Sequence, residues 1–151
     1  MIYIGADHRG FDHKAKINEW MMGRGIAFRD MGAFEYNHED DYVDWAVVVC
    51  EEVARDPGKH RGVLICGSGV GVSVAANKVA KIRCGLGFEP DQTHAARKDD
   101  DINVLAIASD NTATEKAILV VEQFLVTEFV ESESHLRRRE KIERMERWER
   151  N

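Results

Sequence analysis

Short apolar runs alternate along the chain with longer stretches in which apolar and polar positions follow a helical spacing. The short runs predict strands at residues 1–6, 26–30, 62–66, 82–88 and 103–108. The longer stretches predict helices at residues 12–23, 41–55, 70–79, 91–98 and 112–126. Because strand, helix and strand follow one another repeatedly, the pattern indicates an α/β protein with a parallel sheet.

Two predicted strands are continuously apolar, at Val63-Leu64-Ile65 and Val104-Leu105-Ala106-Ile107. Strands of this kind are typical of sheets that are covered by helices on both faces. A chain of 151 residues, of which 44% are hydrophobic, has the usual size of one domain. We therefore predict a single domain, residues 1–151, with a Rossmann-like three-layer α/β/α sandwich and a five-stranded parallel sheet.

A further helix is predicted beyond the sheet, at roughly residues 132–149. Its apolar positions share a helical spacing and comprise Leu136, Ile142, Met145 and Trp148. Arginine and glutamate alternate over the rest of the segment, as expected for a solvated helix face. A tail helix with one apolar stripe is expected to pack on a partner subunit, so we predict a dimer.

Composition excludes several classes of function. The formal net charge of -6 argues against a general nucleic-acid binder. No apolar run approaches the ~20 residues that span a bilayer, and the first strand lacks a basic leader, so no membrane partner is expected. The three cysteines, Cys50, Cys66 and Cys84, form no C-x-x-C pair, which indicates a reducing, cytoplasmic environment.

Candidate chemistry lies where predicted strands end, because ligands of such sheets bind beyond the carboxyl ends of the strands. The first strand leads into Asp7-His8-Arg9-Gly10, and the third leads into Cys66 and the glycine-rich loop Gly67-Ser68-Gly69-Val70-Gly71. Bare backbone N-H groups in this loop, together with the helix dipole, can hold an oxyanion. A dinucleotide fingerprint is the alternative, but Val72 stands where its third glycine belongs.

Cys66 precedes a predicted helix start, a position that favours the thiolate form and hence a nucleophile or base. The alternative is a small buried hydrophobic residue, which is the better interpretation of Cys50 and Cys84. His8 after Asp7 indicates either an acid/base pair or two polar residues of a surface loop. The other histidines lack metal-ligand spacing, so no metal is expected, and Tyr36 is expected to pack.

Five short motifs, in order along the chain, resemble a known family. They are Gly5-Ala6-Asp7-His8-x-Gly10-Phe11, Asp41-Tyr42-x-Asp44, Ile65-Cys66-Gly67-Ser68-Gly69-Val70-Gly71, Ala75-Ala76-Asn77-Lys78 and Asn103-Val104-Leu105. Together they are similar to ribose-5-phosphate isomerase B and its relatives, including the galactose-6-phosphate isomerase subunits. The likeness extends from Ile2 to about Trp148.

The resemblance implies a cofactor-independent aldose-ketose isomerase that works as a homodimer, sometimes a tetramer, with each site shared between two subunits. In that scheme Cys66 moves the proton through a cis-enediolate, which the loop Gly67–Gly71 and the Ser68 hydroxyl stabilise. Asp7, His8 and Tyr42 occupy positions that contact the sugar or its phosphate.

The chain departs from the family pattern at several positions. Asp99 and Asp100 stand where a ring-opening histidine and an asparagine are usual, and Asp110 replaces a phosphate-binding arginine. Ser134 replaces the first of two arginines at the start of the last helix, while the second is retained as Arg138, beside His135. Arg9 restores one positive charge beside the catalytic entrance.

These departures leave three hypotheses. The first is an active isomerase whose substrate is a sugar or sugar phosphate other than ribose 5-phosphate. The second is a catalytically silent subunit of a heteromer, which the replaced histidine favours. The third is a Rossmann-type ligand-binding domain. An intact Asp7, His8, Cys66 and glycine loop argue for the first.

Overall fold

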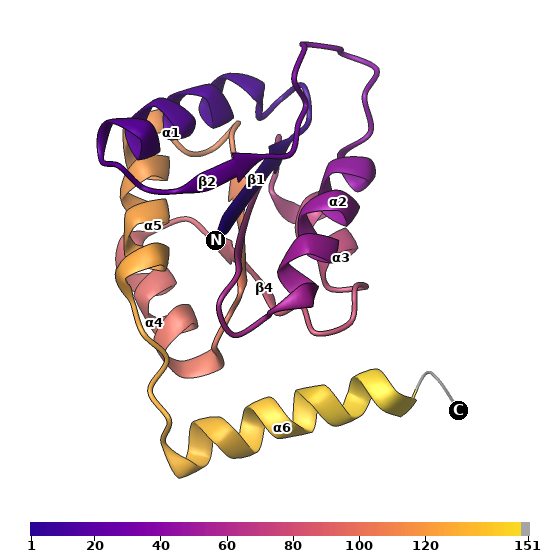
Figure 1. Ribbon diagram of the computed structural model, residues 1–151, viewed down its shortest axis with the longest axis vertical. Helices are drawn as coiled ribbons and strands as arrows, with labels where there is room; N and C mark the ends of the chain where they lie inside the picture. Colours follow the sequence, from indigo (N-terminus) through magenta and orange to yellow (C-terminus); the bar gives the residue numbers. More distant parts are fainter. Residues whose placement is uncertain (149–151) are drawn as a thin grey trace.

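The chain folds into a five-stranded parallel sheet with helices on both faces, which confirms the predicted sandwich (Figure 1). The computed structural model describes the backbone of residues 1–148 and the side chains of residues 1–146. Its strands are β1 (Ile2–Ala6), β2 (Phe28–Asp30), β3 (Arg61–Cys66), β4 (Cys84–Gly87) and β5 (Val104–Ala108). Its helices are α1 (Phe11–Gly23), α2 (Tyr42–Arg55), α3 (Val70–Ala76), α4 (Pro90–Asp100), α5 (Thr114–Val126) and α6 (Glu133–Trp148).

The strand order is β2-β1-β3-β5-β4, and all pairs are parallel. From β1 the chain turns to one side to form β2 and afterwards to the other side to form β3. This reversal lies between β1 and β3, so the carboxyl ends of these two strands flank the switch point at which such sheets bind ligands.

Alternate residues of β3 face two separate apolar cores. Val63 and Ile65 pack with α1 and α5, whereas Leu64 and Cys66 pack with α2 and α3. Helices α1, α4 and α5 therefore cover one face of the sheet and α2 and α3 cover the other (Figure 1). Burial on both faces explains why β3 and β5 are apolar without alternation.

Helix α3 is shorter than predicted and ends at Ala76, not at residue 79. The Asn77 side chain donates to Ser73 O and Cys84 O and accepts from Cys84 N, at 2.9, 3.0 and 2.9 Å. These bonds link the helix end directly to β4. Helix α4 is longer than predicted and includes Asp99 and Asp100, with Asp101 following it in the left-handed region at φ 51°.

Helix α6 begins at Glu133, as expected, and lies across the amino edge of the sandwich (Figure 1). Arg139 donates to Asp101 at 3.1 Å, and both Glu146 oxygens accept from Lys81 N at 3.1 Å. Ile142 and Met145 remain 41% and 60% exposed, so part of the predicted apolar stripe is uncovered in the single chain. The side chain of Trp148 lies outside the described residues.

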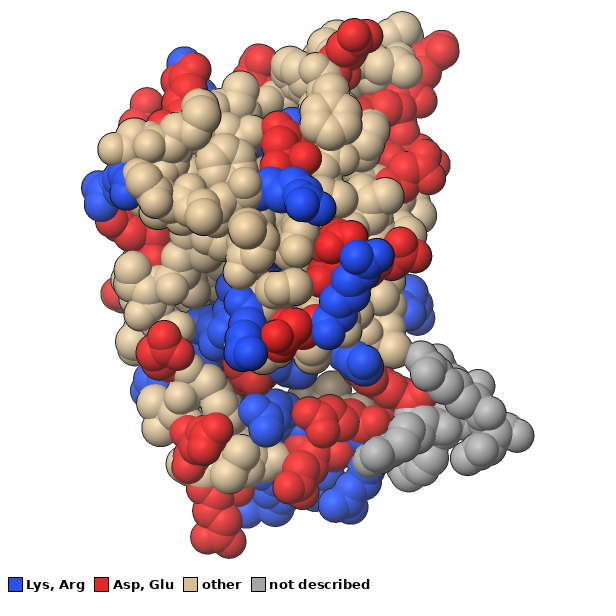
Figure 2. All heavy atoms as spheres, in the orientation of Figure 1, with Lys and Arg blue, Asp and Glu red and all other residues tan. Residues whose placement is uncertain are grey.

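Basic and acidic side chains are interspersed on the face shown in Figure 2, including along α6. None of the helices within residues 1–148 is both long enough and apolar enough to cross a membrane.

Candidate active site

The carboxyl ends of β1, β3 and β5 meet around Cys66. Asp7 N donates to Ile65 O at 3.2 Å, and Ser109 donates to Cys66 O through both its backbone N-H and its hydroxyl, at 3.0 and 3.1 Å. Cys66 itself is 3% exposed and ends β3. The backbone of Cys66 is thus anchored beside the switch point, the place at which sheets of this kind bind ligands.

The two other cysteines are poor candidates for a thiolate base. Burial alone raises the pKa of Cys50 to about 12, and burial also raises the pKa of Cys84 strongly, with Cys50 adding to the effect. Both thiols therefore stay protonated at neutral pH, which agrees with the prediction that they fill space in the core.

The loop after Cys66 requires glycine at position 69 for two reasons. Gly69 has φ +70°, and a Cβ atom there would lie 2.5 Å from Leu86 Cδ1. Ser68 Oγ accepts from Val70 N at 3.2 Å and so begins α3. The backbone N-H groups of Gly69 and Gly71 have no acceptor within the described part of the chain, so both can bind an oxyanion.

Tyr42 reaches this loop from the first turn of α2. A Cβ atom on Gly71 would lie 2.7 Å from Tyr42 Cζ, which means that the phenol ring covers Gly71. Tyr42 is 38% exposed. Their positions are therefore compatible with the prediction that Tyr42 and the glycine loop share a site. The ring can lie there only because Gly71 has no side chain.

Asp7 is almost fully buried, and one of its oxygens accepts from Arg9 N at 3.0 Å and Gly10 N at 3.1 Å. Burial raises the pKa of Asp7 above its ordinary value, although both of these bonds and the nearby His8 act in the opposite direction. Asp7 therefore shapes the turn between β1 and α1, a role that the sequence did not indicate.

His8 is held by Asp40, a residue that the sequence analysis missed. Asp40 Oδ1 accepts from His8 N at 2.9 Å and contacts His8 Nδ1 at 2.7 Å. Tyr36 was expected to pack, but it is 64% exposed and its ring lies edge-on to the His8 ring, with centroids 6.4 Å apart. No sequence spacing signals these contacts, because residues 31–41 form an irregular loop.

Arg9 and Asp110 form an ion pair across Gly67. The Arg9 Nε atom lies 3.3 Å from Asp110 Oδ1, and a second guanidinium nitrogen contacts Oδ2. A Cβ atom on Gly67 would lie 2.5 Å from Arg9 Nε and 2.9 Å from Asp110 Oδ2. The charges of the two side chains therefore neutralise each other beside Gly67, the residue that follows Cys66.

The remaining predicted site residues, Asp99, Asp100, His135 and Arg138, lie at the opposite edge of the sheet. Asp99 and Asp100 end α4, just before β5 begins, and His135 Nε2 lies 3.6 Å from Asp99 Oδ1. Strand β5 separates this edge from Cys66 by about 13 Å, since each residue of a strand advances ~3.3 Å. Within one chain these residues cannot act with Cys66.

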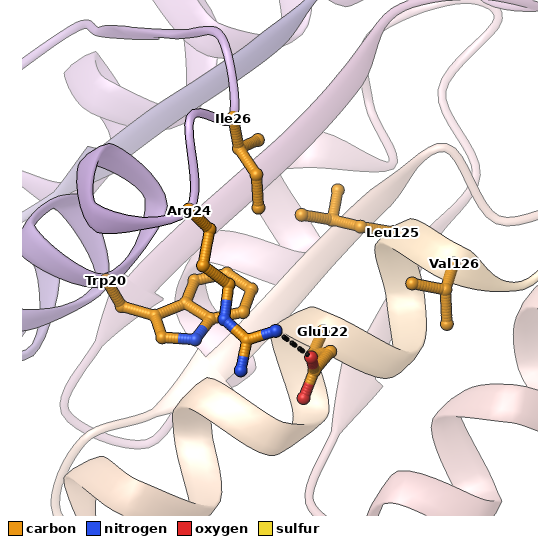
Figure 3. A pocket seen from close by; sticks show the side chains of 6 residues that line it. All are labelled: Trp20, Arg24, Ile26, Glu122, Leu125 and Val126. Carbon is orange, nitrogen blue, oxygen red and sulfur yellow. Dashed lines mark hydrogen bonds and ion pairs between the residues drawn. The ribbon is translucent and has the colours of Figure 1, made fainter.

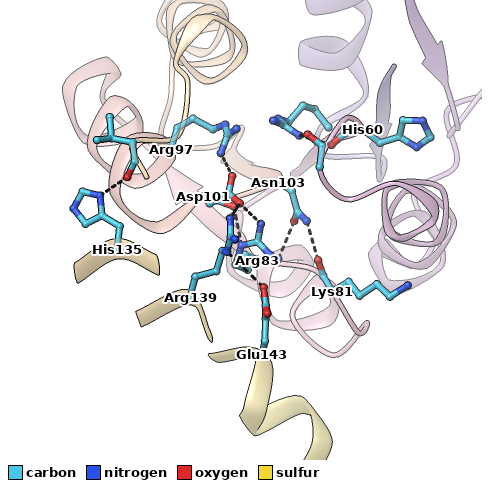
Figure 4. A network of polar contacts seen from close by, with 12 residues as sticks. His60, Lys81, Arg83, Arg97, Asp101, Asn103, His135, Arg139 and Glu143 are labelled. Atoms are coloured by element: carbon cyan, nitrogen blue, oxygen red, sulfur yellow. Dashed lines mark hydrogen bonds and ion pairs between the residues drawn. The ribbon is translucent and has the colours of Figure 1, made fainter. Parts of the chain in front are cut away.

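Asp101, which follows Asp99 and Asp100, has a structural role. Its carboxylate contacts Arg83 at 2.7 Å and Arg139 at 3.1 Å, and it also pairs with Arg97 (Figure 4). The Arg97 side chain is 2% exposed. These contacts join α4, α6 and the segment just before β4. No group of three or more metal-ligating side chains occurs among the described residues.

A separate pocket of about 380 Å³ lies between the carboxyl ends of α1 and α5 (Figure 3). Arg24 crosses it, with the guanidinium 5.2 Å from the Trp20 ring centroid and 2.8 Å from Glu122. Helices that follow parallel strands end at the amino edge of the sheet. This pocket is therefore remote from Cys66, and none of the described residues that line it is a nucleophile or an unpaired base.

The chain is similar to known sugar isomerases over nearly its whole length. The sequence profile described as Ribose/Galactose Isomerase matches residues 2–142. The probable ribose-5-phosphate isomerase B of Mycoplasma genitalium is 36% identical over 97% of this chain and 95% of the relative. The ribose-5-phosphate isomerase B of Mycobacterium leprae is 32% identical over 97% and 90%.

Solved structures agree with these similarities. The crystal structure of the Mycoplasma genitalium ribose-5-phosphate isomerase B, with bound ribulose-5-phosphate, has a TM-score of 0.93 and covers 97% of this chain and 95% of its own. The structure from Thermotoga maritima has a TM-score of 0.89 at 34% identity and covers 95% of this chain and 97% of its own.

Proposed function

The chain belongs to the Ribose/Galactose Isomerase family and is an aldose-ketose isomerase, and we propose that Cys66 is its catalytic base and that its substrate differs from ribose 5-phosphate. The observation that carries this proposal is the position of Cys66 at the carboxyl end of β3, beside a loop whose Gly69 and Gly71 N-H groups have no acceptor among the described residues. A proton next to a carbonyl is removed efficiently only when the base is positioned and the enediolate is held.

In the proposed reaction the Cys66 thiolate takes the proton from C2 of the open-chain aldose. The electron pair forms the C1-C2 double bond of a cis-enediolate, and the negative charge moves to oxygen. Gly69 and Gly71 N-H, with the Ser68 hydroxyl, donate to the enediolate oxygens. The proton of the C2 hydroxyl moves to O1, C2 becomes the carbonyl carbon, and return of the other proton from Cys66 to C1 gives the ketose. The reaction therefore needs no external oxidant or cofactor.

We propose further that the active enzyme is a homodimer with shared sites. The motivation is geometric, because Asp99, His135 and Arg138 lie at the edge of the sheet opposite to Cys66. A twofold partner that packs along α6 would bring its own copies of these residues to the neighbouring Cys66. The uncovered Ile142 and Met145 support such packing. We expect this dimer to act on a small sugar in the cytoplasm.

Altered substrate recognition follows from the charges near Gly67. The Mycoplasma genitalium relative contains bound ribulose-5-phosphate, and a phosphate dianion is best held by cations that are free to donate charge-assisted hydrogen bonds. Here a Cβ atom on Gly67 would meet Arg9 first, and Asp110 already pairs with that cation. An ion pair without net charge favours a sugar phosphate that is shorter than ribose 5-phosphate and is bound at a different angle, or a sugar that carries no phosphate.

The test is a panel of free and phosphorylated aldoses and ketoses incubated with the purified protein in deuterated water. Deuterium exchange at the carbon next to the carbonyl identifies the substrate by proton transfer. We expect exchange with at least one tetrose phosphate or free sugar and weak exchange with ribose 5-phosphate. Absence of exchange with every sugar would favour the silent-subunit hypothesis, which Asp99 in place of a histidine motivates.

A further inference from the structure

His8 is connected to helix α2 by a chain of hydrogen bonds that passes through Asp40. Asp40 Oδ1 accepts from His8 N and contacts His8 Nδ1, while its other oxygen accepts from Trp45 Nε1 at 2.9 Å. The Asp40 side chain is only 8% exposed. Trp45 lies on α2, and its ring lies against Gly32, where a Cβ atom would be 2.3 Å away.

Asp40 is ionised at neutral pH. Burial raises the pKa of its carboxyl, but the hydrogen bonds from His8 and Trp45 outweigh burial and hold that pKa below its ordinary value. A carboxylate has no proton to donate and can only accept. The contact of 2.7 Å with His8 Nδ1 therefore requires that Nδ1 carries the proton.

The other ring nitrogen of His8, Nε2, has no hydrogen-bond partner in the described part of the protein, and the ring is 26% exposed. Tyr36 lies edge-on to the same ring and is itself in contact with Phe11, at centroid distances of 6.4 and 6.1 Å. His8 follows the carboxyl end of β1, next to the end of β3 where Cys66 lies. The ring is thus fixed on several sides while Nε2 stays unpaired.

We propose that Asp40 is a positioning residue that holds His8 in the tautomer with the proton on Nδ1, so that Nε2 is presented as an acceptor for a hydroxyl group of the sugar. Free histidine prefers the opposite tautomer, with the proton on Nε2, so this arrangement needs the carboxylate. An unprotonated Nε2 suits a hydroxyl donor and repels a phosphate oxygen. The claim that Nε2 accepts from a sugar hydroxyl rests on the proposed isomerase function. The claim that Nδ1 carries the proton does not.

The tautomer is measured by ¹⁵N NMR of the histidine rings at about pH 9, well above the usual titration range of histidine. We expect His8 to carry its proton on Nδ1 in the wild type and on Nε2 in Asp40→Ala. In kinetics with the sugar identified by solvent exchange, Asp40→Ala should raise KM about tenfold and leave kcat nearly unchanged, because a ground-state contact is lost.

The matched control is Asp41→Asn, which removes one negative charge at the next residue but keeps a side chain able to cap α2 through Val43 N. It should leave the His8 tautomer unchanged. Equal effects of Asp41→Asn and Asp40→Ala would reduce the role of Asp40 to general electrostatics and overturn the proposal.

If Asp40→Ala fails to fold, two His8 variants decide the matter. His8→Gln places an amide oxygen near the position of Nε2, whereas His8→Asn can replace only Nδ1. The proposal requires Nδ1-H in the wild type and a lower KM for His8→Gln than for His8→Asn. A wild-type proton on Nε2 would contradict it outright. If the wild type shows no isomerase activity, the proposed function fails, while the nitrogen spectra still decide the tautomer.

Discussion

Arg9 and Asp110 face each other across Gly67, with Arg9 Nε 3.3 Å from Asp110 Oδ1. Their side chains are 56% and 40% exposed, so the pair contributes at most about 1 kcal/mol to stability. Its importance is chemical, because it places a pair of side chains without net charge beside Gly67, the residue that follows Cys66. Glycine at position 67 permits this arrangement, since any larger residue would collide with Arg9.

Replacing Asp110 by arginine should change substrate preference. Asp110→Arg removes the partner of Arg9 and adds a second cation, so we expect kcat/KM for ribose 5-phosphate to rise about tenfold relative to free sugars. Asp110→Asn, which only removes the charge, should give a smaller gain. A wild type that already prefers ribose 5-phosphate, with an unchanged preference in Asp110→Arg, would show that this corner does not select the substrate.

Cys66→Ala should lower turnover by at least about 10²-fold, because positioned acid/base groups contribute ~10²–10⁴-fold. The fold and ligand binding should persist, since only one small side chain changes at a strand end. Cys50→Ala is the matched control, and it should cost about 1–2 kcal/mol of stability with little loss of activity. Solvent-exchange rates and thermal unfolding of both variants provide the measurement. Substantial turnover by Cys66→Ala would exclude the thiolate base.

A shared site predicts complementation between two defective variants. Cys66→Ala lacks the base, and the double variant Asp99→Ala/Arg138→Ala lacks the groups expected from the partner. Mixed dimers then contain one intact site, and random pairing should restore about a quarter of the wild-type activity. Hybrid dimers isolated with two different affinity tags allow the measurement. Inactive hybrids would mean that each chain completes its own site, or that Asp99 and Arg138 act elsewhere.

Asp7→Asn should stabilise the protein at neutral pH and impair catalysis. Burial raises the pKa of Asp7, so the ionised carboxylate is disfavoured in the folded state. The free energy of unfolding therefore falls as the pH rises from the unfolded-state pKa of Asp7 through its higher folded-state pKa. A neutral amide still accepts from Arg9 N and Gly10 N. The Tm difference should shrink as pH falls and Asp7 becomes protonated. A constant difference across pH would attribute the effect to packing.

Asp101→Asn should strongly destabilise the chain, because Arg83, Arg97 and Arg139 would lose their shared carboxylate. Removing one partner of a buried ion pair costs about 3–5 kcal/mol. Asp100→Asn, at an exposed neighbouring position, should change stability by less than about 0.5 kcal/mol. Urea unfolding compares the two. Similar midpoints for both variants would mean that the arginines find other partners.

The sequence by itself determined the class of fold and most of the elements. Continuous apolar strands and amphipathic helices are local patterns with fixed periods, so the sheet and the helices were predicted within a few residues of their observed ends. The same patterns indicated Cys66 and its glycine loop, because a glycine-rich turn between a buried strand and a helix can be recognised from neighbouring residues alone. Where a helix end depends on side-chain bonds to a neighbouring strand, as at Asn77, the predicted boundary was wrong.

Only the tertiary structure decided which distant polar residues meet. Arg9 and Asp110 are 101 residues apart, and His8 and Asp40 are 32 apart, so no period along the chain relates them. Strand order brings the first pair together at the end of β3, and an irregular loop delivers Asp40 to His8. The physical reason is that helices and strands arise from local spacing, whereas contacts between side chains depend on how those elements pack.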